Sequence, residues 1–121
     1  MNFQDKKANF QDNQFSNMEE ALRDASKKVI ELNGKDRQMI KAVEEASELT
    51  DSIFKFMKGK VDRTEVLSEL ADNEILGQQI KDMLNCSPEE FAKIKKTKIN
   101  KLRAFLGLSA LAIFCGIFLW L

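Results

Sequence analysis

The sequence predicts an all-α protein, an antiparallel helical bundle followed by a C-terminal transmembrane helix. Two observations predict the bundle: apolar residues recur at intervals of three and four, and N-capping signals precede several of these periodic segments. A third observation predicts the membrane helix, because the last 18 residues carry no charge. With 121 residues, we expect one domain.

The charges are balanced in total but unevenly spread. The chain has 19 basic and 19 acidic residues, yet residues 93–103, the basic neck, hold six basic residues and no acidic one: Lys93, Lys95, Lys96, Lys98, Lys101 and Arg103. The remainder is therefore acidic, which does not suggest that the body binds nucleic acid. Two cysteines, Cys86 and Cys115, imply no disulfide framework, and a reducing, cytosolic setting fits.

The N-terminal part combines a polar repeat with a helix. Residues 1–15 contain N-F-Q-D-K-K-A followed by N-F-Q-D-N-Q-F, and we expect a weakly ordered arm. No apolar run precedes it, so no secretory signal peptide is expected. Ser16 and Glu19 fit a capping box that starts the first helix, and Gly34 fits its C-terminal end. The predicted buried stripe of this helix is Met18, Leu22, Ala25, Val29 and Leu32.

Three further helices follow. The second is predicted over residues 35–58, with a buried stripe of Met39, Val43, Ala46, Thr50, Ile53, Phe54 and Met57. A turn is predicted at K-G-K-V-D, residues 58–62, and Asp62 and Glu65 form a capping box for the third helix. The fourth opens with S-P-E-E at residues 87–90, where Ser is the N-cap and Pro the first helical residue, and it carries the basic neck.

Residues 104–121 are apolar on every side and would form a helix about 27 Å long, close to the roughly 30 Å of a bilayer's hydrocarbon core. The basic neck before them predicts that the body lies in the cytoplasm. Two alternatives are a tail helix buried in an oligomer and a fragment that ends at this run. The predicted organisation is an arm (1–15), a helical domain (16–92), the neck (93–103) and a transmembrane helix (104–121).

Four carboxylates mark the candidate site. Glu45 and Glu48 are three residues apart, as are Glu69 and Asp72, so each pair shares one helix face. In an antiparallel hairpin centred near Lys60, the two pairs meet about 15 Å from the turn. The alternative is a set of solvated carboxylates on two charged helices.

Converging negative charges destabilise a fold unless a cation offsets them. Mg²⁺ is the natural candidate, with Mn²⁺ as a substitute, because it is a hard ion that takes carboxylate and phosphate oxygens. The chain has no histidine, which removes the usual zinc sites and the usual general base.

These residues also carry a family resemblance. E-E-A-S-E-L and E-L-A-D-N-E-I resemble the E-x-x-E and E-x-x-D motif of the all-α MazG-like nucleoside triphosphate pyrophosphohydrolases. The resemblance covers about residues 35–85, including the flanking D-R-Q-M-I-K-A-V and N-E-I-L-G-Q-Q-I-K. It departs from the family at Ser68, where many members have an acidic residue, and in the hydrophobic tail.

The resemblance implies a helical bundle completed in a homodimer or homotetramer. It also implies Mg²⁺-dependent cleavage of a (d)NTP to the monophosphate and pyrophosphate, with Glu45, Glu48, Glu69 and Asp72 as metal ligands. Glu44 or Glu45 would position the attacking water. Four basic residues near the turn are candidates for phosphate contacts, or else a solvated basic turn: Lys55, Lys58, Lys60 and Arg63. Two competing functions are a non-catalytic tail-anchored adaptor and a small membrane-active protein.

Overall fold

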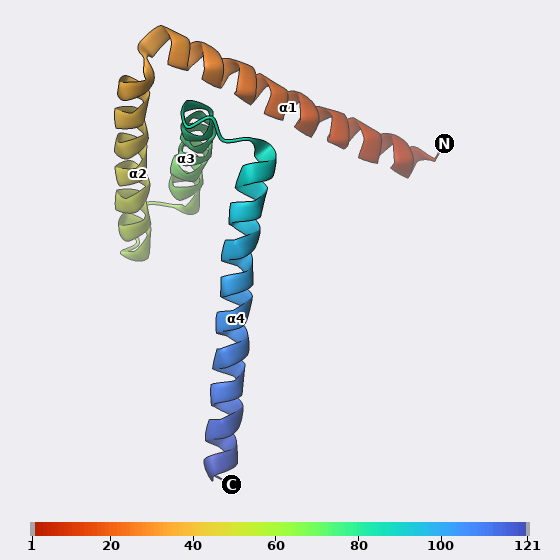
Figure 1. Ribbon diagram of the computed structural model, residues 1–121, viewed down its shortest axis with the longest axis vertical. Helices are drawn as coiled ribbons and strands as arrows, with labels where there is room; N and C mark the ends of the chain where they lie inside the picture. Colours follow the sequence, from red (N-terminus) through yellow and green to blue (C-terminus); the bar gives the residue numbers. More distant parts are fainter. Residues whose placement is uncertain (1, 121) are drawn as a thin grey trace. The chain divides into compact units, whose positions relative to one another are not determined.

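The computed structural model describes residues 2–120, without the side chains of residues 3, 5, 6, 8–10, 109, 110, 112, 114 and 117–120. The described chain is helical with no strand: α1 (Phe3–Asn33), α2 (Lys35–Met57), α3 (Arg63–Met83) and α4 (Pro88–Trp120) (Figure 1). The all-α prediction is confirmed. The chain divides into two compact units, Met1–Asn85 with the first three helices and Cys86–Leu121 with α4.

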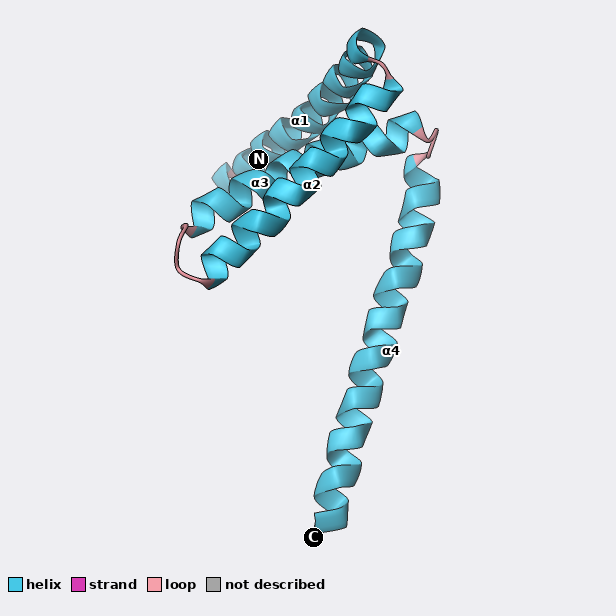
Figure 2. Cartoon of the chain, turned by 90° about the vertical axis from the view of Figure 1, so that its left-hand side faces the viewer, coloured by secondary structure: helices cyan, strands magenta, loops and turns pink. Residues whose placement is uncertain are grey.

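Helices α2 and α3 form an antiparallel hairpin, and α1 packs against both (Figure 2). The hairpin turn uses Gly59 at a left-handed φ of 69°, which glycine adopts without a steric penalty. Asp62 caps α3, because its carboxylate accepts a hydrogen bond from the Glu65 N–H at 3.1 Å. The predicted turn and cap are both confirmed.

Helix α1 begins at Phe3, so the predicted helix start at Ser16 is wrong. No glycine or proline occurs before Gly34, and the helix therefore continues through Ser16 without a break. The end of the helix is as predicted: Gly34 has a φ of 85° and its N–H donates to the Ile30 carbonyl at 2.9 Å.

The interior of the first unit is largely polar. Among the described residues the buried apolar side chains are Leu76 and Met83. The buried polar side chains are Ser26, Gln38, Glu45, Ser52 and Gln79. Of these, Gln38 and Gln79 join α2 to α3 by a side-chain hydrogen bond. The Ser52 hydroxyl donates within α2, and the Glu45 carboxylate pairs with a lysine of its own helix.

The predicted buried stripe of α2 is exposed except for Met39, which is half-buried. Val43 is 67 % exposed and Met57 74 %, whereas the buried positions of α2 are Gln38, Glu45 and Ser52. The two faces lie about 120° apart around the helix axis. In α1 likewise, the apolar Met18 and Leu32 of the predicted stripe are exposed. Leu22 and Val29 of the same α1 stripe are half-buried, so part of that prediction holds. For α2, periodicity identified the apolar face but not the face that packs against the neighbouring helices.

The second unit is formed by α4. Its predicted start is confirmed, since the Glu90 N–H donates to Ser87 Oγ at 3.1 Å. Within the described residues, none of the helices has both the length and the apolar character required to cross a membrane. The predicted membrane helix 104–121 is therefore left without support. Leu121 and several side chains of this segment lie outside the described part of the chain. The boundaries of the predicted arm, helical domain and neck stay predictions.

Candidate metal centre

Three of the four predicted ligands come together. One carboxylate oxygen each from Glu45 and Glu48 of α2 and Glu69 of α3 lie within 4.8 Å of one another. Glu45 is buried, Glu69 is half-buried and Glu48 is exposed, so the acidic cluster made by these three residues grades from the helix interface to solvent. An ion could enter from the Glu48 side.

Asn73 joins α2 to α3 at the level of the acidic cluster. Its Nδ2 donates to the Glu45 carbonyl of α2 at 2.9 Å and to the Glu69 carbonyl of α3 at 2.8 Å. Asn73 therefore links α2 and α3 through the main chain of two acidic-cluster residues. The sequence analysis did not single out Asn73, although it lies four residues after Glu69 and so on the same face of α3.

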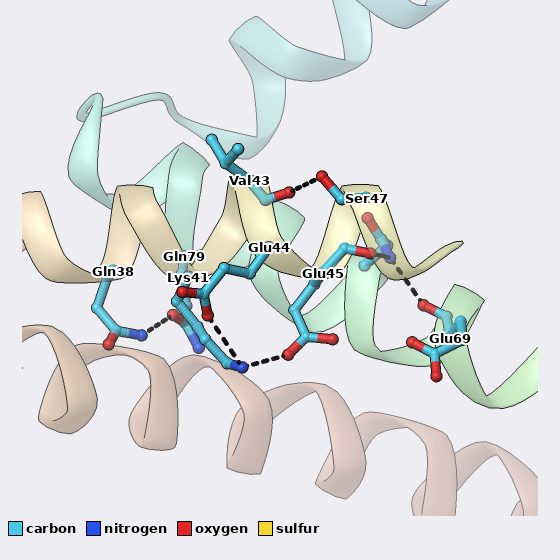
Figure 3. Close-up of polar contacts among 9 residues, drawn as sticks. Gln38, Lys41, Val43, Glu44, Glu45, Ser47, Glu69 and Gln79 are labelled. Carbon is cyan, nitrogen blue, oxygen red and sulfur yellow. Dashed lines mark hydrogen bonds and ion pairs between the residues drawn. The ribbon is translucent and has the colours of Figure 1, made fainter. Parts of the chain in front are cut away.

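Lys41 is a cation that the sequence analysis missed. Its Nζ lies 2.7 Å from Glu45 Oε1 and 3.5 Å from Glu44 Oε2, and Figure 3 shows Lys41 between these two carboxylates. The hydrogen bond to Glu45 raises the pKa of Lys41, with the charge of Glu45 adding to it. The spacing was available as a signal, because Lys41 and Glu45 are four residues apart on one helix face.

The Glu69 carboxylate combines a raised pKa with a buried, unpaired oxygen atom. Partial burial raises the pKa of Glu69, and the negative charges of Glu48, Asp72 and Glu45 raise it further. Its Oε2 atom is buried and has no hydrogen-bond partner. A buried oxygen without a donor carries a desolvation penalty, and a bound cation would remove that penalty.

The other predicted acidic residues lie at the margin of the acidic cluster. Asp72 is half-buried and is not one of the three converging residues, although its charge acts on Glu69. Glu44 is exposed and its described partner is Lys41. The structure therefore brings together Glu45, Glu48 and Glu69 and leaves Asp72 and Glu44 beside them.

The basic residues near the turn have no described contact with the acidic cluster. Lys55 Nζ pairs with Asp51 Oδ2 at 2.6 Å, and this hydrogen bond raises the pKa of Lys55. Lys58, Lys60 and Arg63 are exposed. In the part of the chain that the structure describes, none of the four pairs with Glu45, Glu48 or Glu69.

Buried amides extend the polar interface away from the acidic cluster. Gln38 Nε2 donates to Gln79 Oε1 at 2.6 Å, and Asn33 Nδ2 donates to Gln38 Oε1 at 3.0 Å. Gln38 lies two helical turns before Glu45, on the same face of α2, and Figure 3 shows both side chains along that face. These amides were also missed, since a glutamine in a helix is ordinarily a surface residue.

The donor set fits a hard divalent cation. All three cluster side chains offer carboxylate oxygens, which Mg²⁺ and Mn²⁺ accept and which soft metals do not favour. An ion would give the buried Glu69 Oε2 the partner that it lacks, and it would have to compete with Lys41 for Glu45.

We compared the chain with protein-family models, with curated proteins and with solved structures, and no match was found. The chemical interpretation of the acidic cluster therefore rests on its own residues.

Proposed function

We propose that this protein is a Mg²⁺-dependent nucleoside triphosphate pyrophosphohydrolase that converts a (d)NTP to the monophosphate and pyrophosphate. The observation that carries the proposal is the approach of three carboxylate oxygens, from Glu45, Glu48 and Glu69, to within 4.8 Å of one another. The MazG-like motif on the same residues supports the choice of substrate. Phosphoryl transfer needs positioning and charge neutralisation above all, and carboxylates that hold metal ions supply both.

Each residue has a distinct part in this proposal. Glu48 and Glu69 bind the ion, and Mg²⁺ when bound neutralises phosphate charge and lowers the pKa of a coordinated water. Glu45 either joins them as a ligand or orients the attacking water, and Glu44 is the alternative for that second part. A bound ion would displace Lys41, whose Nζ lies 2.7 Å from Glu45 Oε1, and its ammonium group would then be available to a phosphate oxygen.

The assembly belongs to the proposal as well. The exposed apolar stripe of α2 supports a MazG-like bundle completed by a second copy of the chain, in a homodimer or homotetramer. A row of exposed apolar side chains along one helix face is typical of an interaction site. We further propose that residues 104–121 hold the protein at a membrane, with the body on the cytoplasmic side.

A nucleotide panel tests the activity. The full chain, kept in a mild detergent, is incubated with each NTP and dNTP and Mg²⁺, and pyrophosphate, phosphate and the nucleoside monophosphate are measured. We expect monophosphate and pyrophosphate in equal amounts for at least one nucleotide. Glu48→Gln and Glu69→Gln should each lower the rate by about 100-fold or more. Glu74→Gln, an exposed acidic position of α3 outside the acidic cluster, is the matched control.

A non-catalytic adaptor is the second candidate, and the Lys41–Glu45 ion pair favours it. Lys41 already compensates one carboxylate of the acidic cluster, so the remaining acidic residues would be a charged surface and the apolar stripe of α2 would bind another protein. In that case no nucleotide is cleaved, and Glu48→Gln changes neither Mg²⁺ binding nor stability. The two candidates are separated by Mg²⁺ calorimetry on the parent and the Glu48→Gln variant.

A further inference from the structure

The basic neck lies on α4 as a continuous stretch of exposed positive charge. All six basic residues of positions 93–103 are exposed, and no acidic residue interrupts them. Within the described residues none of the six forms an ion pair, whereas Lys28, Lys41 and Lys55 of the first unit each have a carboxylate partner. The neck therefore carries charge that the second unit itself does not neutralise.

The six basic side chains leave α4 in all directions. At 3.6 residues per turn, their directions leave no sector wider than about 80° without a positive charge. A helix that lies flat on a surface keeps its charges on one side. Positive charge on every side is instead expected for a helix that is surrounded by anionic groups.

Apolar side chains occur among and directly after these charges. Ile94, Ile99 and Leu102 lie within the neck and are exposed, and Phe105 and Leu106 follow it, also exposed. The long stems of lysine and arginine allow their charged ends to reach a polar layer while neighbouring apolar side chains enter a nonpolar one. A bilayer surface offers the two layers side by side, and a nucleic acid in water offers no apolar layer of this kind.

We propose that the basic neck binds the anionic headgroups of a phospholipid bilayer, so that the membrane partner of this protein is specifically an anionic leaflet. The proposal rests on the membrane attachment proposed above, but not on the acidic cluster or on nucleotide cleavage, because every residue that it uses lies in the second unit. Its electrostatic part acts over about 10 Å at moderate salt, and the neck, about 15 Å long, is within that range of the headgroups over most of its length.

Vesicle flotation with the full chain tests the proposal. Partition is measured into vesicles of phosphatidylcholine alone and of phosphatidylcholine mixed with phosphatidylglycerol, and the ratio of the two partition coefficients is the readout. This ratio cancels any contribution of the apolar tail, which is the same for both vesicles. We expect a ratio well above one at low salt that falls toward one at high salt.

Two triple variants with equal charge loss isolate the neck. Lys95→Gln, Lys96→Gln and Lys98→Gln together should lower the ratio at least tenfold, because each basic residue near an anionic surface contributes about a fivefold preference. Lys27→Gln, Lys35→Gln and Arg37→Gln together remove three exposed charges from the first unit and should leave the ratio unchanged. Glutamine keeps the helix propensity of lysine, and circular dichroism verifies equal helix content.

Three results would overturn the proposal. The first is a parent ratio that salt does not change, a result that needs no variant and so is independent of variant folding. The second is an equal loss in the two triple variants, which would assign the effect to net charge. The third is displacement of the protein from anionic vesicles by a short DNA duplex at comparable charge concentration, which would make the neck a nucleic-acid surface. Nucleotide cleavage is measured in parallel on the parent protein. None of these three results bears on that activity, so the two proposals can fail separately.

Discussion

Lys41 Nζ lies 2.7 Å from Glu45 Oε1, so one carboxylate of the acidic cluster already has a cation on its own helix. Lys41 is exposed, with 47 % of its side chain accessible, so a divalent ion could displace it without unpacking the helix interface. The pair provides a counter-charge that keeps the buried Glu45 compatible with folding before metal is bound.

Replacing Lys41 should tighten Mg²⁺ binding. In Lys41→Met the ion no longer competes with an ammonium group for Glu45, and we expect a several-fold lower dissociation constant by calorimetry, together with a lower melting temperature without metal. Lys35→Met, an exposed lysine of the same helix, should change neither. An unchanged Mg²⁺ affinity in Lys41→Met would show that Glu45 is not a ligand.

The stability of the metal-free protein should fall as pH rises above the ordinary carboxyl range. The pKa of Glu69 is raised in the fold, so between its unfolded and folded pKa the native state holds a proton that the unfolded chain has lost. In that window stability falls with increasing pH, and it is highest below the unfolded pKa. Melting temperatures recorded from mildly acidic to neutral pH measure how stability changes with pH.

Added Mg²⁺ should reverse this loss at neutral pH and have little effect at acidic pH, where a proton competes for Glu69. In Glu69→Gln the neutral-pH loss should disappear and so should the response to Mg²⁺. Glu74→Gln should keep both. A pH slope that persists unchanged in Glu69→Gln would place its origin elsewhere in the chain.

Asn73→Ala should loosen the hairpin. It removes the hydrogen bond that joins α3 to the Glu45 carbonyl of α2, and such a loss costs about 1–2 kcal/mol of unfolding free energy. Urea denaturation should show a lower midpoint, while the dependence of the unfolding free energy on urea concentration stays unchanged. Asn17→Ala, at an exposed position of α1, should leave the midpoint within experimental error, and equal midpoints for the two variants would contradict the bridging role.

A charged residue on the exposed apolar stripe of α2 should weaken the self-association of the protein. Val43 and Phe54 are both exposed and lie on one face of α2. Val43→Asp would place a charge in any interface formed there, so sedimentation equilibrium in detergent should show a smaller species at micromolar concentration. Asn17→Asp is the matched control. A parent protein that is already monomeric would disprove the proposed assembly.

Local signals in the sequence predicted the ends of the helices well where a specific residue was required. Gly34, Gly59, Asp62 and Ser87 each act through their own backbone or side chain, and each lies where it was expected. The predicted start of α1 at Ser16 was wrong because a Ser-x-x-Glu pattern is also compatible with a helix interior. A capping box predicts a boundary only if something before it stops the helix.

The faces of the helices were harder to predict than their ends. The hairpin register and the approach of Glu45, Glu48 and Glu69 followed from spacing about a short turn, because an antiparallel pair has few alternatives. The buried face of α2 did not follow, since it is lined by the polar residues Gln38, Glu45 and Ser52. Hydropathy gives no weight to such residues, although Gln38 has a hydrogen-bond partner in Gln79 across the interface and Ser52 has one within α2.

A single residue, Gly34, separates α1 from α2, and its φ of 85° with ψ of 155° is a combination that only glycine adopts readily. The 31 residues of α1 extend about 45 Å from this point, so the two torsions of Gly34 set the direction in which the whole helix runs. A reorientation of about 10° at Gly34 would displace the far end of that helix by roughly 8 Å. The φ and ψ of this one residue must therefore stay close to their observed values for α1 to keep its contacts with α2 and α3.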